Sequence, residues 1–257
     1  MTVVAFASAK FSPGVSTLAE LVALTRPGEH SCLLVDCDPA GSEWVVRPGV
    51  AAEPGLVTLA MAGRRELAAG TALEHAQTVG ALRVVVAPAS ARQAASALDI
   101  VGDRLGAHLA ALEGLDVVVD CGRLDTRSPA VAVARAADLV VLVARPAVSD
   151  LVHVAPWVEL LGAHSLAVAL VGTGRGRQQV AYSPAEIADA LGVPVLGVVA
   201  DDPKAAARLF AGPGSLAPVA RSRLARSAAD VAANAFSVAR ASSPAPTRTT
   251  TAEEVRT

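Results

Sequence analysis

The chain has 257 residues, of which 53% are hydrophobic, and its formal net charge at pH 7 is −2. This length and apolar content favour one large α/β domain with a substantial core. The near-neutral charge excludes the strongly basic field that marks many nucleic-acid binders. Aromatic residues make up only 3% of the chain, which argues against base-stacking surfaces.

The spacing of the cysteines and the hydropathy of the sequence indicate the cellular compartment of the protein. Cys32, Cys37 and Cys121 stand singly, without the paired spacing of a zinc site or a disulfide framework, so we expect small buried hydrophobic residues. No apolar run approaches the ~20 residues of a membrane span, and no secretory leader is recognisable. These patterns predict a cytoplasmic protein.

Short aliphatic runs alternate with alanine-rich helical stretches along the chain. Several of the runs are apolar at consecutive positions, which is typical of strands covered on both faces. The expected strands are residues 3–7, 32–36, 82–87, 116–120, 139–144, 166–171 and 194–199. The expected helices are residues 15–25, 90–113, 128–137, 149–162, 183–191, 203–210 and 219–240. This alternation predicts a doubly wound α/β domain with a mostly parallel sheet flanked by helices.

Two segments do not follow this alternation. Residues 47–82 carry Gly and Pro breaks, with short helical patches at about 56–60 and 72–77, and their role is open. Residues 241–257 are polar, contain proline and have no period, so we expect a flexible tail after a single domain at 1–240.

The first chemical signal is a buried strand that runs straight into a glycine-containing loop at residues 10–17. A P-loop of this kind binds phosphate with backbone N–H groups at a helix N-terminus, one lysine, and a Ser or Thr hydroxyl on Mg²⁺. Gly14 is the loop's expected last glycine and Ser16 the expected Mg²⁺ hydroxyl. The lysine position between them is Val15, so the loop lacks its usual charge.

Carboxylates follow two of the other expected strands. Asp36 and Asp38 end the second strand, and Asp120 ends the fourth and precedes Gly122. The carboxyl ends of parallel strands are where ligands gather, so these acids are candidates for holding Mg²⁺ and orienting water. The simpler alternative is that they end strands and start turns, as aspartate often does.

Together these motifs resemble the ParA/MinD group of P-loop ATPases, whose loop typically reads Lys-Gly-Gly-Val-Gly-Lys-Thr. Lys10 matches the group's signature lysine, and Gly14 and Ser16 match its last glycine and its Mg²⁺ hydroxyl. Asp36 and Asp38 match the Asp-x-Asp after the second strand, and Asp120 matches the Walker B acid. Residues 137–150 and 191–202 are similar to later strand and loop segments of the group, so the resemblance spans about residues 1–240.

The resemblance implies ATP or ADP and Mg²⁺ as ligands, and it implies roles for individual residues. Lys10 and Asp38 would be catalytic, and Ser16, Asp36 and Asp120 would hold the metal. The residues implied in nucleotide binding are Lys10, Phe11, Ser12, Pro13, Gly14, Val15, Ser16, Thr17 and Thr173. A flexible surface loop is the alternative reading of the stretch around Thr173.

The resemblance also implies a role and a partner. Members of the group dimerise around two nucleotides, with the signature lysine of one subunit reaching the phosphates of the other, and they position cargo inside the cell. We therefore expect a homodimer that works with a protein of a partition, positioning or polar machine, recruited to a pole, the nucleoid or the inner membrane face. Direct DNA or membrane contact is less favoured, because a solvated face is the preferred interpretation of the arginines at 47, 64, 65, 221, 223, 226 and 240.

The departures from the loop pattern leave two functions open. Phe11 and Ser12 add bulk where two glycines are usual, Pro13 has no N–H to donate, and Val15 removes a charge-assisted contact. These changes favour a pseudo-ATPase that binds nucleotide weakly and acts as a dimeric scaffold or adaptor. The alternative is an active partition or division-site ATPase that uses Lys10, Ser16, Asp38 and Mg²⁺.

Overall fold

A computed structural model of the chain describes residues 1–161, 166–172 and 182–242. Its centre is an eight-stranded sheet in the order β3-β4-β2-β5-β1-β6-β7-β8. Neighbouring strands are parallel except β3 and β4, which pair antiparallel. The strands are β1 (Val3–Ser8), β2 (Ser31–Asp36), β3 (Gln77–Val79), β4 (Leu82–Val85), β5 (Leu115–Arg123), β6 (Leu139–Ala144), β7 (Leu166–Gly172) and β8 (Val195–Ala200).

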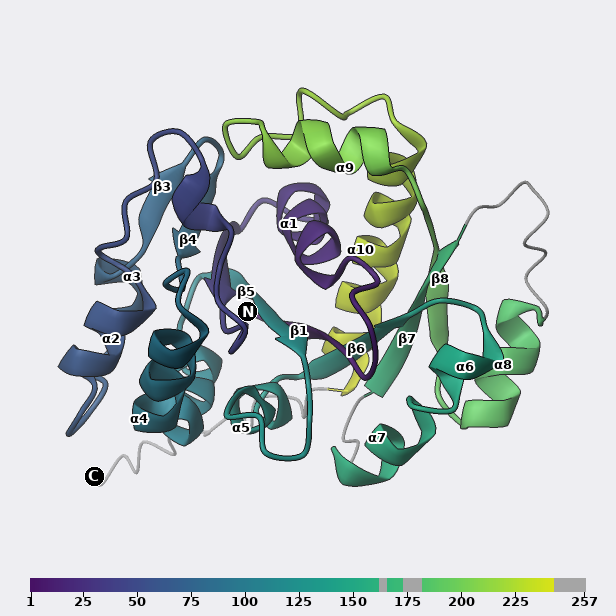
Figure 1. Ribbon diagram of the computed structural model, residues 1–257, viewed down its shortest axis with the longest axis horizontal. Coiled ribbons are helices and arrows are strands. Elements are labelled where there is room, and N and C mark those ends of the chain that lie inside the picture. The colour runs from purple at the N-terminus through teal and green to yellow at the C-terminus, as the bar shows by residue number, and fades with distance from the viewer. Residues whose placement is uncertain (162–165, 173–181, 243–257) are drawn as a thin grey trace, which may run out of the picture.

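Helices cover both faces of this sheet, as Figure 1 shows. On one face lie α1 (Val15–Thr25), α9 (Pro203–Phe210) and α10 (Arg223–Ser242). The other face carries α4 (Ala91–Ala110), α5 (Ala130–Arg135), α7 (Ala155–Leu160) and α8 (Pro184–Leu191). Shorter elements complete the chain: the 3₁₀ turn η1 (Trp44–Val46), α2 (Leu56–Ala62), α3 (Thr71–Glu74) and α6 (Val148–Leu151). The predicted doubly wound, mostly parallel α/β fold is therefore confirmed.

The central strand β1 explains why the core has two halves. Its six residues are all buried, but alternate side chains point to opposite faces. Val4 and Phe6 pack in the apolar cluster under α1 and α10, whereas Val3, Ala5 and Ala7 pack in the cluster on the other face. A strand that is covered on both faces has no position for a polar side chain until it ends. Its chemistry is therefore confined to the strand ends.

Two predicted elements differ from the structure. The helix expected at 149–162 is divided into α6 and α7, because Pro156 has no N–H and its ring clashes with the carbonyl of the residue four positions earlier. The helical patch expected at 72–77 ends early, and Gln77–Val79 forms the antiparallel edge strand β3 instead. Helix α10 runs to Ser242, and residues 243–257, where the tail is predicted, lie outside the described residues.

Candidate functional site

The loop between β1 and α1 opens at the carboxyl edge of the sheet. Gly14 caps α1 with φ 99°, a left-handed conformation that suits glycine, and Val15 begins the helix. The free N–H groups of the first helical turn therefore lie at this edge, next to the ends of β2 and β5. An N-terminus in this position favours a negatively charged ligand.

The loop positions that depart from the P-loop pattern have distinct environments. Val15 is 6% exposed and packs in the apolar cluster under α1, so its side chain serves the core. Phe11 has φ 58°, the left-handed backbone that glycine would adopt without strain, and its ring is 46% exposed. Lys10 is exposed, and its Nζ lies 5.6 Å from the centre of the Phe11 ring.

The register of β2 and β5 brings two of the predicted metal ligands together. Asp36 and Asp120 are direct neighbours across the two strands, and each is 3% exposed. The backbone N–H of Asp38 donates to Oδ1 of Asp36 at 3.1 Å, and that of Gly122 donates to Oδ1 of Asp120 at 2.9 Å. The Ser42 side chain lies close enough to Asp36, and the Ser16 side chain close enough to Asp120, to lower the pKa of each carboxyl group. Ser16, Asp36 and Asp120 therefore lie together on the wall of one cavity.

Burial perturbs these two carboxyl groups. Desolvation raises the pKa of Asp36 to about 6, against the lowering effect of the Ser42 hydrogen bond. Desolvation, followed by repulsion from Asp36, raises the pKa of Asp120 to about 7. Two neighbouring buried carboxylates without a cation between them disfavour each other's charged form. Such perturbed acids are typical of sites that receive a positive ligand.

Asp38 lies beside Asp36 and Asp120, and the space for its carboxylate depends on the absence of a side chain at Gly122. Its Oδ1 accepts the backbone N–H of Ala40 at 2.8 Å, and desolvation raises its pKa. Gly122 has φ 58°, and a Cβ added there would collide with the Asp38 carboxylate. The positive charge of Arg123 also acts on Asp38. Gly122, two residues after Asp120, therefore gives the Asp38 carboxylate its space.

These residues surround a cavity of about 460 Å³, which lies within the range of about 300–1,000 Å³ usual for ligand pockets. The predicted residues that line it are Phe11, Ser12, Gly14, Val15, Ser16, Thr17, Asp36, Asp38 and Asp120. Lys10 is not among the lining residues, and Pro13 lines a separate hollow of about 70 Å³ with Asp201 and Asp202. Thr173 lies outside the described residues.

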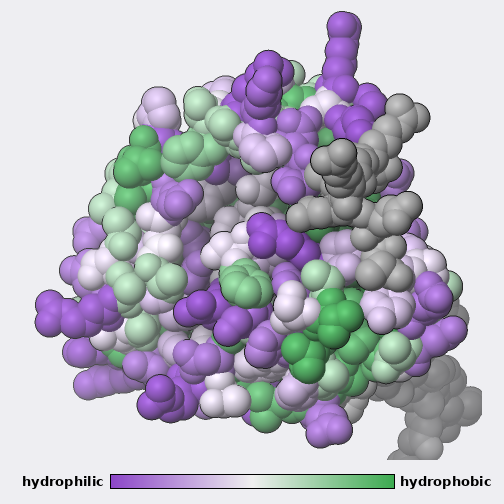
Figure 2. All heavy atoms as spheres, turned by 45° about the vertical axis from the view of Figure 1, so that its right-hand side comes forward, coloured by the Kyte–Doolittle hydropathy of each residue, from purple (hydrophilic) through white to green (hydrophobic). Residues whose placement is uncertain are grey.

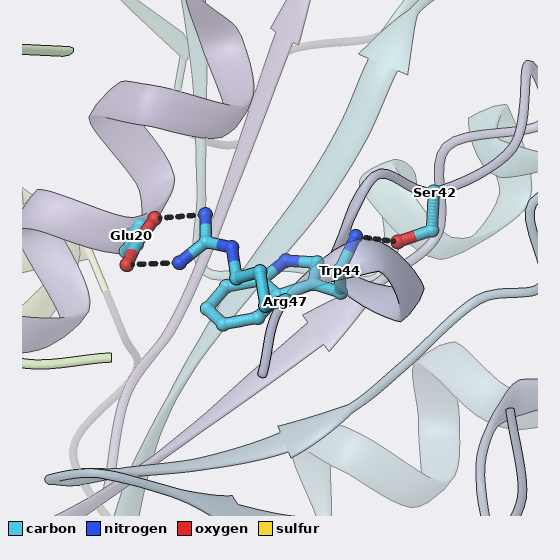
Figure 3. Close-up of polar contacts among 4 residues, drawn as sticks. All are labelled: Glu20, Ser42, Trp44 and Arg47. Atoms are coloured by element: carbon cyan, nitrogen blue, oxygen red, sulfur yellow. Dashed lines mark hydrogen bonds and ion pairs between the residues drawn. The ribbon is translucent and has the colours of Figure 1, made fainter. Parts of the chain in front are cut away.

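Sequence reasoning missed a second group on the cavity wall, drawn in Figure 3. Arg47 forms a two-fold ion pair with Glu20, its Nη1 and Nη2 each lying 2.7 Å from one carboxylate oxygen. Its guanidinium lies 3.8 Å from the Trp44 ring centre. The expectation that Arg47 belongs to a solvated arginine face is wrong, because its side chain is only 7% exposed. The available signal was Glu20, a charged residue on an otherwise apolar face of α1.

The donor set fits a hard divalent cation. Asp36 and Asp120 supply carboxylate oxygens and Ser16 a hydroxyl, the ligand types that Mg²⁺ accepts together with several waters. Among the described residues, no group of three or more His, Cys, Asp or Glu side chains is arranged to hold a metal ion. A cation here would thus depend on the hydroxyl and on water or ligand oxygens as well as the two acids.

The surface bears on the partner predictions. Figure 2 shows a face on which apolar side chains lie in patches among polar ones. Val148 in α6 and Val152, which directly follows α6, are exposed apolar residues. Of the arginines near α10, Arg226 donates to the carbonyl of Arg221, and Arg240 is ion-paired with Asp116. None of the helices that the structure describes has the length and apolarity needed to cross a membrane.

Comparison with known proteins identifies the fold. No protein-family model matches the sequence, and no curated protein matches it. Among solved structures, a ParA family ATPase from Chlorobium tepidum matches with a TM-score of 0.72 at 22% identity, covering 90% of this chain and 97% of that chain. The MinD cell division ATPase of Pyrococcus furiosus matches with a TM-score of 0.70 at 17% identity, covering 92% and 98%.

A third match includes a bound nucleotide. The septum site-determining protein MinD of Pyrococcus horikoshii, complexed with Mg-ADP, has a TM-score of 0.65 at 18% identity, with 90% of this chain and 94% of that chain covered. The fold is thus that of a P-loop nucleotide-binding protein. Within that class it is the fold of the ParA and MinD ATPases, so the predicted resemblance is confirmed at the level of the fold.

Proposed function

We propose that this chain is a ParA/MinD-like nucleotide-switch protein for intracellular positioning or partitioning, with a weakened phosphate site. The observation that carries the proposal is the meeting of Ser16, Asp36 and Asp120 beside the N-terminus of α1, in a fold shared with these ATPases. The P. horikoshii MinD, which has this fold, binds Mg-ADP. ATP or ADP with Mg²⁺ is therefore the proposed ligand.

The charge of the cavity supports weak binding and impaired hydrolysis. Its wall carries more acidic than basic groups: Glu20, Asp36, Asp38, Glu43 and Asp120 against Arg47 and Arg123. Val15 offers no charge to the phosphates, and its burial gives its side chain a packing role instead. Because phosphoryl transfer depends mainly on electrostatic stabilisation, we propose a pseudo-ATPase that acts as a dimeric scaffold or adaptor.

A homodimer and a protein partner are part of this proposal. Lys10 is exposed and does not line its own chain's cavity, which suits a lysine directed at a second copy. The exposed Val148 and Val152 offer apolar contact area for a protein partner. We propose a cytoplasmic protein recruited to its site of action through such contacts rather than through DNA or lipid.

Titration of the purified chain with fluorescent ATP, with and without Mg²⁺, tests the proposal. We expect weak, Mg²⁺-dependent binding and little turnover. Val15→Lys restores the missing charge, so it should tighten binding by about tenfold if the rest of the loop is competent. No gain would assign the defect to Phe11, Ser12 and Pro13.

An active ATPase is the alternative, and one observation favours it. Asp38 lines the same cavity as Ser16 with one carboxylate oxygen bound to the Ala40 N–H, so the other can orient a water. Micromolar binding with steady turnover that disappears in Asp38→Ala would establish the active enzyme and exclude the pseudo-ATPase.

A further inference from the structure

Arg47 is the cavity residue whose charge and burial are hardest to explain by packing alone. The two basic residues on the cavity wall differ sharply: Arg123 is exposed and opposes Asp38, whereas the Arg47 side chain is 7% exposed. Burying a guanidinium is expensive unless its N–H groups find acceptors. The contacts of the Arg47 guanidinium therefore indicate its function.

Three elements fix the position of Arg47. Glu20 of α1 accepts from both terminal nitrogens, the Trp44 ring of η1 lies 3.8 Å from the guanidinium carbon, and the Phe210 ring of α9 lies 5.2 Å away. A guanidinium held by a carboxylate and an aromatic face loses little further rotamer entropy when it binds an anion. Arg47 is thus preorganised on the cavity wall.

This arrangement leaves a donor unused. The Nε–H of Arg47 is buried and has no hydrogen-bond partner. An unsatisfied buried donor costs about 1–3 kcal/mol, more for a charged group. Glu20 accepts one N–H from each terminal nitrogen, and a guanidinium carries five N–H groups, so Arg47 keeps further donors on those nitrogens. Because Arg47 lines the cavity, these donors are available to an acceptor that a ligand supplies there.

The location of Arg47 suits an anion that also reaches the helix N-terminus. Glu20 follows Ser16 by four residues, so the two side chains lie on the same face of α1 about 5–6 Å apart. Arg47, bound to Glu20, lines the same cavity as Ser16. An anion that reaches the N-terminus of α1 in this cavity therefore lies along the wall to which Arg47 belongs.

We propose that Arg47 is the cationic group at which the cavity binds a phosphate-bearing anion, in place of the lysine that Val15 replaces. The inference rests on the proposed function, because it concerns the phosphates of the same ligand. Glu20 positions the guanidinium through the ion pair and partly neutralises its positive charge. The affinity of the cavity for the anion is therefore low. Arg47 is therefore a binding residue and Glu20 a positioning residue.

Isothermal titration of the full chain with Mg-ATP and, separately, with inorganic pyrophosphate tests this inference. Arg47→Gln should weaken both affinities by at least about tenfold. Glu20→Gln keeps an amide partner for Arg47 but removes the competing charge, so it should strengthen both affinities about threefold. Arg123→Gln, which removes the same charge from the same cavity, should change them less than twofold.

The signs of these effects distinguish binding from a structural clamp. If the ion pair only fastens η1 to α1, Glu20→Gln and Arg47→Gln will both weaken binding, and the inference is overturned. It is also overturned if Arg123→Gln matches Arg47→Gln, since the effect is then one of bulk charge. If Arg47→Gln fails to fold, Arg47→Met replaces it, since methionine keeps the apolar contacts and removes the charge, and binding equal to the wild type would refute the role of Arg47 as the cationic group.

The two ligands separate this inference from the proposed function. Mg-ATP binding that Arg47→Gln leaves unchanged would refute the Arg47 site while the nucleotide proposal stands. Pyrophosphate binding that depends on Arg47, without any Mg-ATP binding, would support the anion site and refute the nucleotide proposal. Binding of neither ligand to the wild-type chain would overturn the anion site.

Discussion

The two ends of strand β5 each carry a buried aspartate, and the two are treated differently. Asp116, near the amino end, is fully buried and faces two cations, Arg26 at 3.4 Å and Arg240 at 3.6 Å. Asp120, near the carboxyl end, is 3% exposed and has another carboxylate, Asp36, as its neighbour. One end of the strand is neutralised within the chain and the other is not.

The aspartate at the amino end of β5 contributes to stability, whereas the one near the carboxyl end is suited to contact a ligand. A buried acid with basic partners needs no ligand to balance its charge, although Asp116 Oδ1 and Arg26 Nε are buried without a hydrogen-bond partner. Two neighbouring buried acids repel each other when both are ionised, and a bound cation would relieve this unfavourable electrostatic free energy. The carboxyl edge is also the edge at which α1 presents its free N–H groups. Substitutions and ligand addition at the two ends of β5 would test this contrast.

Asp116→Ala should give the largest loss of stability. It leaves Arg26, whose side chain is 10% exposed, without its partner, and breaking a buried pair in this way costs about 3 kcal/mol. Urea unfolding measures the change. Arg240→Gln is the control, since Arg240 is 46% exposed and its removal should cost less than about 1 kcal/mol. Equal losses of unfolding free energy in the two variants would contradict a stabilising role for the buried pair of Asp116 and Arg26.

Asp120→Asn should change the pH dependence of stability. Burial raises the pKa of Asp120 to about 7, whereas an aspartate in the unfolded chain ionises near about pH 4. The folded chain therefore binds more protons between these values, and wild-type stability should fall as pH rises from about 4 to about 7 by up to about 1.4 kcal/mol per unit.

The variant lacks this ionisation, so it should become more stable than the wild type as pH approaches 8. Unfolding free energies measured at several pH values give the difference. A difference that stays constant with pH would show that Asp120 titrates like an exposed acid.

Gly122→Ala should cost more than Gly114→Ala. Both glycines have positive φ, 58° and 73°, so both substitutions introduce backbone strain of about 1–2 kcal/mol. Only at Gly122 does the new Cβ also collide with the Asp38 carboxylate, while at Gly114 it meets nothing within 4 Å. An extra loss of about 1 kcal/mol in chemical unfolding is expected for Gly122→Ala. Equal costs would mean that Asp38 moves aside freely.

Millimolar MgCl₂ should stabilise the wild-type chain by about 1 kcal/mol, a shift of about 2–4 °C in melting temperature. The cation would relieve the repulsion between Asp36 and Asp120, and its effect should be larger at pH 8 than at pH 6 because it requires ionised carboxylates. Asp120→Asn should abolish the shift and EDTA should reverse it. An equal shift in that variant would place the ion elsewhere.

Sequence reasoning succeeded where local pattern decides structure. Helix α1 begins at Val15 and ends at Thr25, as predicted, and α9 also has its predicted bounds. The end of β2 at Asp36 also follows from an uninterrupted apolar run, whereas β5 continues beyond its predicted end at Asp120 to Arg123. The predictions were wrong where contacts between distant parts of the chain determine the secondary structure. The edge strand β3 exists because β4 offers it a partner, although its three residues carry no strong strand signal.

Sequence pattern was enough to predict the fold class and the acids that gather at the carboxyl edge of the sheet. Apolar strands must be buried on both faces, and parallel strands bring their ends to one edge, so the positions of Asp36 and Asp120 follow from pattern alone. The contact of Arg47 with Glu20, which lies 27 residues earlier, and with the rings of Trp44 and Phe210 became visible in the folded chain alone. An ion pair between distant residues depends on how helices dock on the sheet, and no local spacing encodes that geometry.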